Sequence, residues 1–204
     1  MAKRNEVGLL TLANIVTGSR IILLLLLTSV IRFDLPWIRY GCPALIPILF
    51  YLDSLDGYLA RRYHAETKLG SVLDIAGDRI VENVLWLLLA YLRVLPFWIP
   101  VLVLVRAFLT DGFRSVALAS GECSTFSMMR SKLGWWLVAS PISRTSYAML
   151  KAVVFTAGLS IWSFRLGNCT ALTVPFATLV TFTLLHCFAR GTCAIVECSR
   201  SLAS

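Results

Sequence analysis

The feature of this sequence that most limits its fold is the run 166–189, which contains no Asp, Glu, Lys or Arg. A chain inside a lipid bilayer has to pair its backbone polar groups internally, and about 20 apolar residues in a helix cross the hydrocarbon. The whole chain has a similar character, because 58% of its 204 residues are hydrophobic and 15% are charged, whereas soluble domains have roughly 25% charged residues. We therefore predict an all-α integral membrane protein that forms a single domain over residues 1–204.

We expect this domain to contain six transmembrane helices. A short helix within 7–17 is expected to lie along the membrane surface before the first span. No small-residue cleavage site precedes Arg32, so the first apolar stretch is predicted to be retained as a helix rather than removed as a signal peptide. The other expected elements are spans at about Tyr40–Arg61, Gly70–Leu92, Trp98–Ala119, Thr145–Phe164 and Leu166–Ala189, an interfacial helix at 128–140 and a polar tail after Arg190.

Acidic residues are concentrated at one end of the second and third spans. The uncharged part of the second span ends at Leu52 and that of the third begins at Asn83, so neither is long enough to cross the bilayer alone. Both helices must therefore continue through acidic positions, which are Asp53, Asp56, Asp74 and Asp78. Within a helix, residues three or four apart share a face, so each pair of aspartates projects in one direction. Acids at such positions predict a functional site.

Four carboxylates that converge in a region of low dielectric repel one another by several kcal/mol unless cations lie between them. Oxygen ligands suit Mg²⁺ or Mn²⁺, and four carboxylates are enough for two such ions. Gly57, Ala60 and Gly70 leave room for a ligand, and Arg61 adds a cation suited to phosphate. Two metals with an arginine describe a diphosphate site, where a carboxylate can also accept the proton of an attacking alcohol.

These residues form the pattern D-x2-D-G-x2-A-R-x8-G-x3-D-x3-D over 53–78, with all eight positions occupied. In this pattern the chain resembles the CDP-alcohol phosphatidyltransferases. The resemblance implies transfer of a phosphatidyl group from CDP-diacylglycerol to an alcohol, with release of CMP, in phospholipid biosynthesis. It implies that the four aspartates hold two divalent cations, that Asp78 is also the general base, and that Gly57, Ala60, Arg61 and Gly70 line the nucleotide pocket. A homodimer is implied by the resemblance alone.

The acceptor alcohol is predicted from weaker features. Asn14-x2-Thr17-x2-Arg20, together with the placement of Pro96 and of 106–114, looks like the phosphatidylglycerophosphate synthases, which use glycerol 3-phosphate. The phosphate of that acceptor needs basic partners, and the candidates are Arg20, Arg106, Arg114, Arg144 and Lys151. The residues at 75, 79, 107 and 143–145 depart from those synthases, so inositol, inositol phosphate, serine and phosphatidylglycerol stay open as acceptors.

Several of these side chains also have purely structural interpretations. Arg20 could pair with a helix end, and Arg144 and Lys151 could anchor a span at an anionic leaflet. Asp111 and Arg114 are spaced for a local ion pair, and we assign His64 and His186 to structure. Among whole functions, the alternative of another class is a cation transporter that uses the intramembrane carboxylates, and a further one is an inactive lipid-binding scaffold.

The distribution of basic residues predicts the orientation in the membrane, because loops rich in Lys and Arg stay in the cytoplasm. The loops on one side contain Arg32, Arg39, Arg93 and Arg165. The other side contains Lys3, Arg4, Arg61, Arg62, Lys68, Arg79, Arg114, Arg130, Lys132, Arg144, Arg190 and Arg200. The acidic site is therefore expected to face the cytoplasm from the inner (plasma) membrane of a bacterium. Anionic lipid headgroups or a phosphorylated substrate explain the net charge of +8 better than nucleic acid does.

Overall fold

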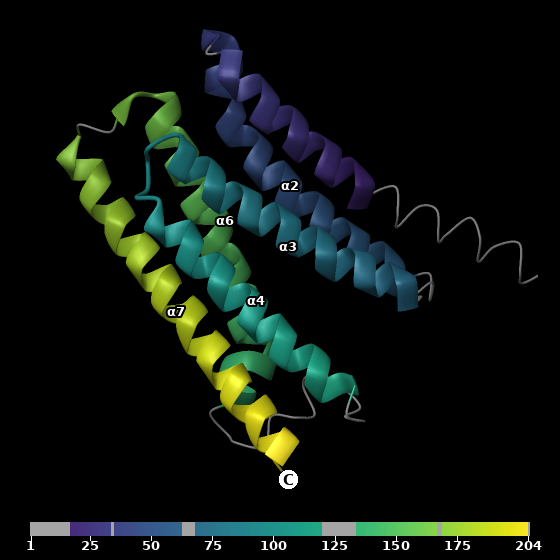
Figure 1. Ribbon diagram of the computed structural model, residues 1–204. Helices are drawn as coiled ribbons and strands as arrows, with labels where there is room; N and C mark the ends of the chain where they lie inside the picture. Colours follow the sequence, from purple (N-terminus) through teal and green to yellow (C-terminus); the bar gives the residue numbers. More distant parts are fainter. Residues whose placement is uncertain (1–16, 34, 63–67, 120–133, 167–168, 204) are drawn as a thin grey trace, which may run out of the picture. The chain divides into compact units, whose positions relative to one another are not determined.

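The computed structural model describes residues 17–33, 35–62, 68–119, 134–166 and 169–203, with only the backbone course described for 53–62, 68–74, 117–119 and 201–203. Every regular element in these ranges is helical, as Figure 1 shows. The elements are a helix at 17–30, η1 (Ile31–Phe33), α2 (Pro36–Arg62), α3 (Lys68–Tyr91), α4 (Trp98–Ala119), η2 (Trp135–Ala139), α6 (Pro141–Ser163) and α7 (Thr170–Ala203). The prediction of an all-α protein is confirmed.

The helices that carry the acidic motif have the extended form that the sequence predicts. α2 continues without interruption through positions 53 and 56 to Arg62, and α3 begins at Lys68, before positions 74 and 78. α4 has the predicted bounds, Trp98–Ala119. In each case the apolar run alone is short, and continuing the helix through the polar residues keeps the backbone groups hydrogen-bonded.

The prediction of a polar tail after Arg190 is wrong, because α7 continues to Ala203. Cys187, Ala194 and Cys198 are spaced seven and four residues apart and are almost fully buried, so one apolar stripe continues past the first charged residue. Ala194 and Cys198 pack against Val138 of η2, a π-helical turn. The interfacial helix expected at 128–140 is described only from 134 onward, and the one expected at 7–17 lies almost wholly outside the described residues.

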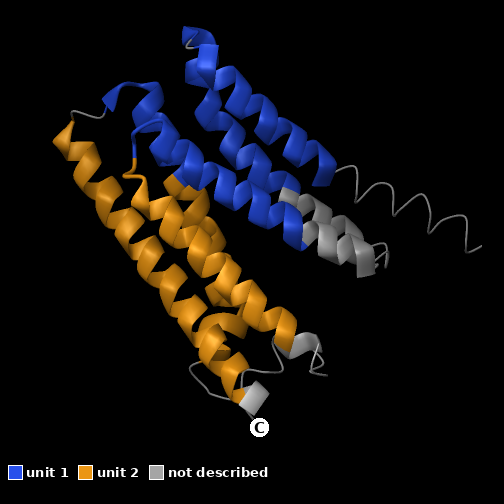
Figure 2. Cartoon of the chain, in the orientation of Figure 1, with its two compact units in different colours: residues 1–94, 155–167 blue, residues 95–154, 168–204 orange. Residues whose placement is uncertain are grey.

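The chain divides into two compact units, coloured separately in Figure 2. Unit 1 comprises 1–94 and 155–167, and unit 2 comprises 95–154 and 168–204, so the division falls within α6. The core of unit 1 centres on Phe155 of α6. Its ring stacks on Phe50 of α2 at 6.3 Å between centroids and meets Trp86 of α3 edge-on at 5.1 Å. Three helices from distant parts of the sequence are thus joined by aromatic contacts.

A second contact in unit 1 ties the start of α2 to the end of α6. Arg39 donates from Nε to the Ser163 carbonyl at 2.9 Å and from Nη2 to the Trp162 carbonyl at 2.6 Å. The Ser163 hydroxyl donates in return to the Arg39 carbonyl at 2.7 Å. Because the last carbonyls of a helix have no partner within it, this arginine caps α6 and fixes α2 beside it.

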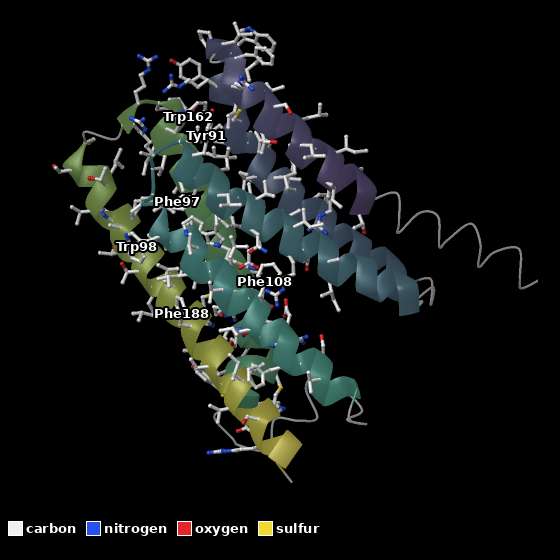
Figure 3. The ribbon with its side chains drawn as sticks, in the orientation of Figure 1. Tyr91, Phe97, Trp98, Phe108, Trp162 and Phe188 are labelled. Atoms are coloured by element: carbon white, nitrogen blue, oxygen red, sulfur yellow. The ribbon has the colours of Figure 1, made fainter. Side chains whose placement is uncertain are left out.

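In unit 2, α4 packs along α7 and η2 packs against the C-terminal part of α7. Many large apolar side chains in this unit are nevertheless exposed. Phe97, Trp98 and Phe108, labelled in Figure 3, are 70%, 57% and 72% exposed. Among the described residues, one helical stretch, Thr170–Arg200, meets the length and composition expected of a membrane span.

Candidate functional site

The backbone of unit 1 places the four motif aspartates on two helices, Asp53 and Asp56 on α2 and Asp74 and Asp78 on α3. Because both segments are helical, the spacings of three and four residues put each pair on one helix face. The side chains of Asp53, Asp56 and Asp74 lie outside the described residues. Within the described part of the chain, no group of three His, Cys, Asp or Glu side chains is placed to hold a metal.

Asp78 is the motif carboxylate whose surroundings the structure describes. Its side chain is 50% exposed, and its Oδ1 accepts a hydrogen bond from Arg20 Nη2 at 3.0 Å. The Arg20 side chain is 4% exposed and comes from the helix at 17–30. A buried guanidinium thus holds an accessible carboxylate. Arg20, which the sequence predicts as an acceptor ligand, contacts the predicted base.

The helix at 17–30 and α3 approach each other closely beside this ion pair. A Cβ atom added to Gly77 would lie 2.8 Å from Cγ2 of Thr17, which is too close for two carbon atoms. Thr17 precedes Arg20 by one helical turn, and Gly77 precedes Asp78 by one residue. The missing side chain at 77 therefore lets the two helices approach closely at this level.

One turn beyond Asp78, Glu82 is buried, and its Oε2 lies 3.9 Å from Arg79 Nη1. This ion pair on α3 is an i, i+3 contact. The residues predicted to line the nucleotide pocket are in the helical parts of α2 and α3, but their side chains lie outside the described residues: Gly57, Ala60, Arg61 and Gly70.

The other predicted acceptor ligands are all in unit 2. Arg106 on α4 is only 9% exposed, and Gly191 of α7 lies directly against its side chain. Arg114, about two turns further along α4, forms an ion pair with Asp111 at 4.0 Å, which is the local contact that the sequence allows. On α6, Arg144 is exposed, and Lys151 Nζ lies 4.6 Å from the centre of the Tyr147 ring.

Arg190 of α7 is a member of this basic group that the sequence interpretation missed. It donates from Nη1 to the Leu137 carbonyl and to the Ser143 hydroxyl, both at 2.7 Å, and its guanidinium lies 5.6 Å from the Tyr147 ring centre. Arg106, Arg114 and Arg144 are close enough to Arg190 to act on it as like charges. The sequence did contain a signal for Arg190, which directly follows the long uncharged run. An arginine in an apolar helix needs a partner.

His186 lies in the same group, and its contacts fit the structural role predicted for it. Its Nε2 is 3.3 Å from the Ser143 hydroxyl, and its ring stacks on Tyr147 with 5.4 Å between centroids. The Ser143 hydroxyl itself donates to the Leu137 carbonyl at 2.6 Å. His64 lies outside the described residues.

The acidic motif lies on α2 and α3 of unit 1, and the comparison with protein families identifies the class of enzyme. The family model for CDP-alcohol phosphatidyltransferases matches residues 10–199, and the chain belongs to this family. It is therefore a transferase, and this class assignment favours transfer chemistry over the cation transporter considered from the sequence.

A curated relative from Bacillus subtilis (strain 168) is named CDP-diacylglycerol–glycerol-3-phosphate 3-phosphatidyltransferase. It is 26% identical over 134 residues, which cover 59% of this chain and 69% of the relative.

Proposed function

We propose that this protein transfers the phosphatidyl group of CDP-diacylglycerol to glycerol 3-phosphate and releases CMP. The name of the Bacillus relative supports this acceptor. The observation that carries the proposal is that three arginines of unit 2 lie close enough to Arg190 to act on it as like charges: Arg106, Arg114 and Arg144. Like charges brought close together repel one another, and an additional anion among them relieves this repulsion. The phosphate of glycerol 3-phosphate is such an anion.

Arg106 is best suited among these residues to bind a phosphate. It is almost fully buried, and among the described residues no side-chain or backbone acceptor is bonded to its Nε. A buried donor without an acceptor is costly, and a phosphate oxygen would satisfy it. Arg114, Arg144 and Lys151 are proposed as further phosphate ligands, as the sequence predicts.

The acidic motif is proposed to hold two divalent cations, Mg²⁺ or Mn²⁺, through Asp53, Asp56, Asp74 and Asp78. Carboxylate oxygens are ligands that suit these ions, and the motif supplies them from two helices. Asp78, the motif aspartate whose side chain the structure describes, is half exposed. Such ions neutralise the charge that develops on a diphosphate leaving group. Gly57, Ala60, Arg61 and Gly70 are proposed to leave space for the nucleotide and bind its diphosphate.

Asp78 is proposed to be the general base. Its carboxylate is accessible and held by a fixed donor, so it can accept the proton of the acceptor hydroxyl while that oxygen attacks phosphorus. The phosphorus–oxygen bond to CMP breaks as the new phosphodiester bond forms, and the proton moves from the alcohol to Asp78.

We propose that the helices form a six-span bundle in the inner membrane of a bacterium, with the motif facing the cytoplasm and with the enzyme acting as a homodimer. The exposed aromatic and aliphatic side chains of α4 support contact with lipid. In this setting the acyl chains of the substrate stay in hydrocarbon while the nucleotide and the acceptor enter from water.

The acceptor is tested with purified protein in detergent, CDP-diacylglycerol, Mg²⁺ and a panel of labelled alcohols. We expect CMP release and labelled lipid with glycerol 3-phosphate, and neither with inositol, inositol phosphate, serine or phosphatidylglycerol. A chelator should abolish the reaction, and Mg²⁺ or Mn²⁺ should restore it. CMP release that is equally fast without any acceptor would contradict the proposal, and preference for another alcohol in the panel would replace glycerol 3-phosphate.

A further inference from the structure

We propose that Arg20 is a positioning residue for Asp78, and that it acts on catalysis through this carboxylate instead of binding the acceptor. The inference rests on the proposed role of Asp78 as base. It does not depend on which alcohol is the acceptor.

The accessibility of the two side chains is the first argument. Arg20 is one of the most buried charged residues described, with 3% of the residue exposed, whereas half of the Asp78 side chain is exposed. A substrate can therefore reach the carboxylate but has little access to the guanidinium. The hydrogen bond from Nη2 to Oδ1, at 3.0 Å, is charge-assisted.

The hydrogen-bond pattern of the carboxylate is the second argument. In the described part of the chain, Arg20 donates to Oδ1 of Asp78 and no second donor to this carboxylate is found. One oxygen is thus anchored from the protein interior, and the exposed part of the carboxylate is accessible to a ligand or an incoming hydroxyl. A carboxylate anchored through one oxygen has a defined plane, and small misplacements of a catalytic group cost about 100-fold in rate.

The packing beneath the ion pair is the third argument. Thr17 and Gly77 bring the helix at 17–30 and α3 into close contact, and the Arg20 side chain leaves the first helix one turn further on. A methyl group on residue 77 would come within 2.8 Å of Thr17 Cγ2, so the Thr17 side chain or the helices themselves would have to shift. The same contact thereby sets the distance over which Arg20 reaches Asp78. The helix contact and the ion pair therefore form one cluster of four residues: Thr17, Arg20, Gly77 and Asp78.

The test compares Arg20→Lys and Arg20→Gln with the unmodified enzyme in steady-state assays that vary glycerol 3-phosphate and CDP-diacylglycerol separately. We expect kcat to fall about 10-fold for Arg20→Lys and about 100-fold for Arg20→Gln, with KM for the acceptor changed by less than about threefold. Binding of CDP-diacylglycerol, measured by calorimetry, should stay within about threefold of the unmodified protein. Partial rescue by lysine would show that the cation at this position is needed.

Gly77→Ala provides a second variant that leaves both charged groups in place. We expect it to lower kcat about 10-fold, because the added methyl group separates the helices and stretches the Arg20–Asp78 contact. Gly18→Ala is the matched control, since a Cβ atom at 18 meets nothing within 4 Å, and its kcat should equal that of the unmodified enzyme.

Three outcomes would overturn the proposal. A rise of 10-fold or more in the acceptor KM with kcat preserved at saturation would place Arg20 on the acceptor. Unchanged kinetics in Arg20→Gln would remove it from catalysis. Equal loss of CDP-diacylglycerol binding and turnover in all three variants would show a purely structural role. If the panel identifies another alcohol, the same comparison is made with that alcohol, so failure of the proposed acceptor is distinguished from failure of this inference.

Discussion

At the scale of single residues, two buried arginines, one in each unit, carry the functional proposals. Asp78 is half exposed and bonded to buried Arg20, while Arg106 is buried on α4 with an Nε that is bonded to no acceptor among the described residues. The first arrangement orients a base, and the second offers a donor to an anion. Burial of either guanidinium lowers the stability of the fold, because the buried group has lost the hydration that water provided.

Replacement of Asp78 by asparagine should separate binding from turnover. Asparagine retains the shape and can still bind near Arg20, but it cannot accept a proton at neutral pH, so we expect kcat to fall by about 100-fold to 10,000-fold. Binding of CDP-diacylglycerol, measured by calorimetry, should weaken far less than turnover. Asp34→Asn, two positions before the first residue of α2 in the sequence, serves as the control, and an active Asp78→Asn enzyme would exclude Asp78 as the base.

Replacement of Arg190 by lysine should destabilise the protein. Arg190 satisfies the Leu137 and Val138 carbonyls at 2.7 and 3.3 Å and binds the Ser143 hydroxyl, and a lysine cannot reach all three with one ammonium group. We expect a loss of about 1–3 kcal/mol, since the Val138 carbonyl and the Ser143 hydroxyl would not both keep their donor from residue 190. Thermal unfolding in detergent measures this loss. Arg200→Lys is the control, because the Arg200 side chain is 71% exposed and its 3.8 Å ion pair with Glu197 lies at the surface.

At the scale of elements, glycines decide where helices come into close contact. Gly77 allows the helix at 17–30 to approach α3, and Gly191 allows α7 to approach Arg106 on α4. Each of these glycines lies next to a charged residue of the site. Gly18, Gly41 and Gly112 have open space around them, so they have no comparable packing role among the described residues.

Gly191→Ala should therefore disturb the α4–α7 contact. The added methyl group would overlap Arg106 Nε and come within 3.1 and 3.3 Å of its Cγ and Cδ, so the whole arginine stem has to move. We expect a destabilisation of about 1–3 kcal/mol and a higher KM for glycerol 3-phosphate.

Gly112→Ala, also on an α-helix of unit 2, is the control for this substitution. It should be neutral or stabilising by up to about 1 kcal/mol, because alanine favours the helix more than glycine does. Chemical denaturation and acceptor kinetics of the two variants would be compared. An equal response of both proteins would contradict the proposed contact between Arg106 and the acceptor.

At the scale of the whole molecule, the proposed orientation places the aspartate motif and the basic group on the cytoplasmic side. Cys169, directly before α7, is exposed and belongs to the opposite side in this topology. Arg200, near the other end of α7, belongs to the cytoplasmic side. The two ends of α7 thus report on opposite faces of the membrane.

A membrane-impermeant maleimide should therefore label Cys169 in intact cells that express a variant with Cys169 as its single cysteine. A cysteine introduced as Arg200→Cys in a cysteine-free background should be protected in intact cells and labelled after permeabilisation. Mass spectrometry or a gel shift measures the modification. The reverse pattern would show that the active site faces outward.

The amino-acid sequence alone determined the family and the courses of α2, α3 and α4, because these depend on local spacing. Eight residues at fixed intervals predicted the transferase motif, and the apolar runs predicted α4 at its observed bounds and the extension of α2 and α3 through the aspartates. Backbone hydrogen bonds within a helix join residues four apart, so such features are visible in the order of residues.

Only the tertiary structure showed which charged side chains meet. Arg20 and Asp78 are 58 residues apart in the chain, and Arg190 reaches Ser143 across 47, so no local pattern encodes either contact. The continuation of α7 beyond Arg190 also depended on tertiary packing, because Ala194 and Cys198 are buried against η2. A charged residue ends an apolar run in the sequence, but a helix ends where its buried face loses its partner.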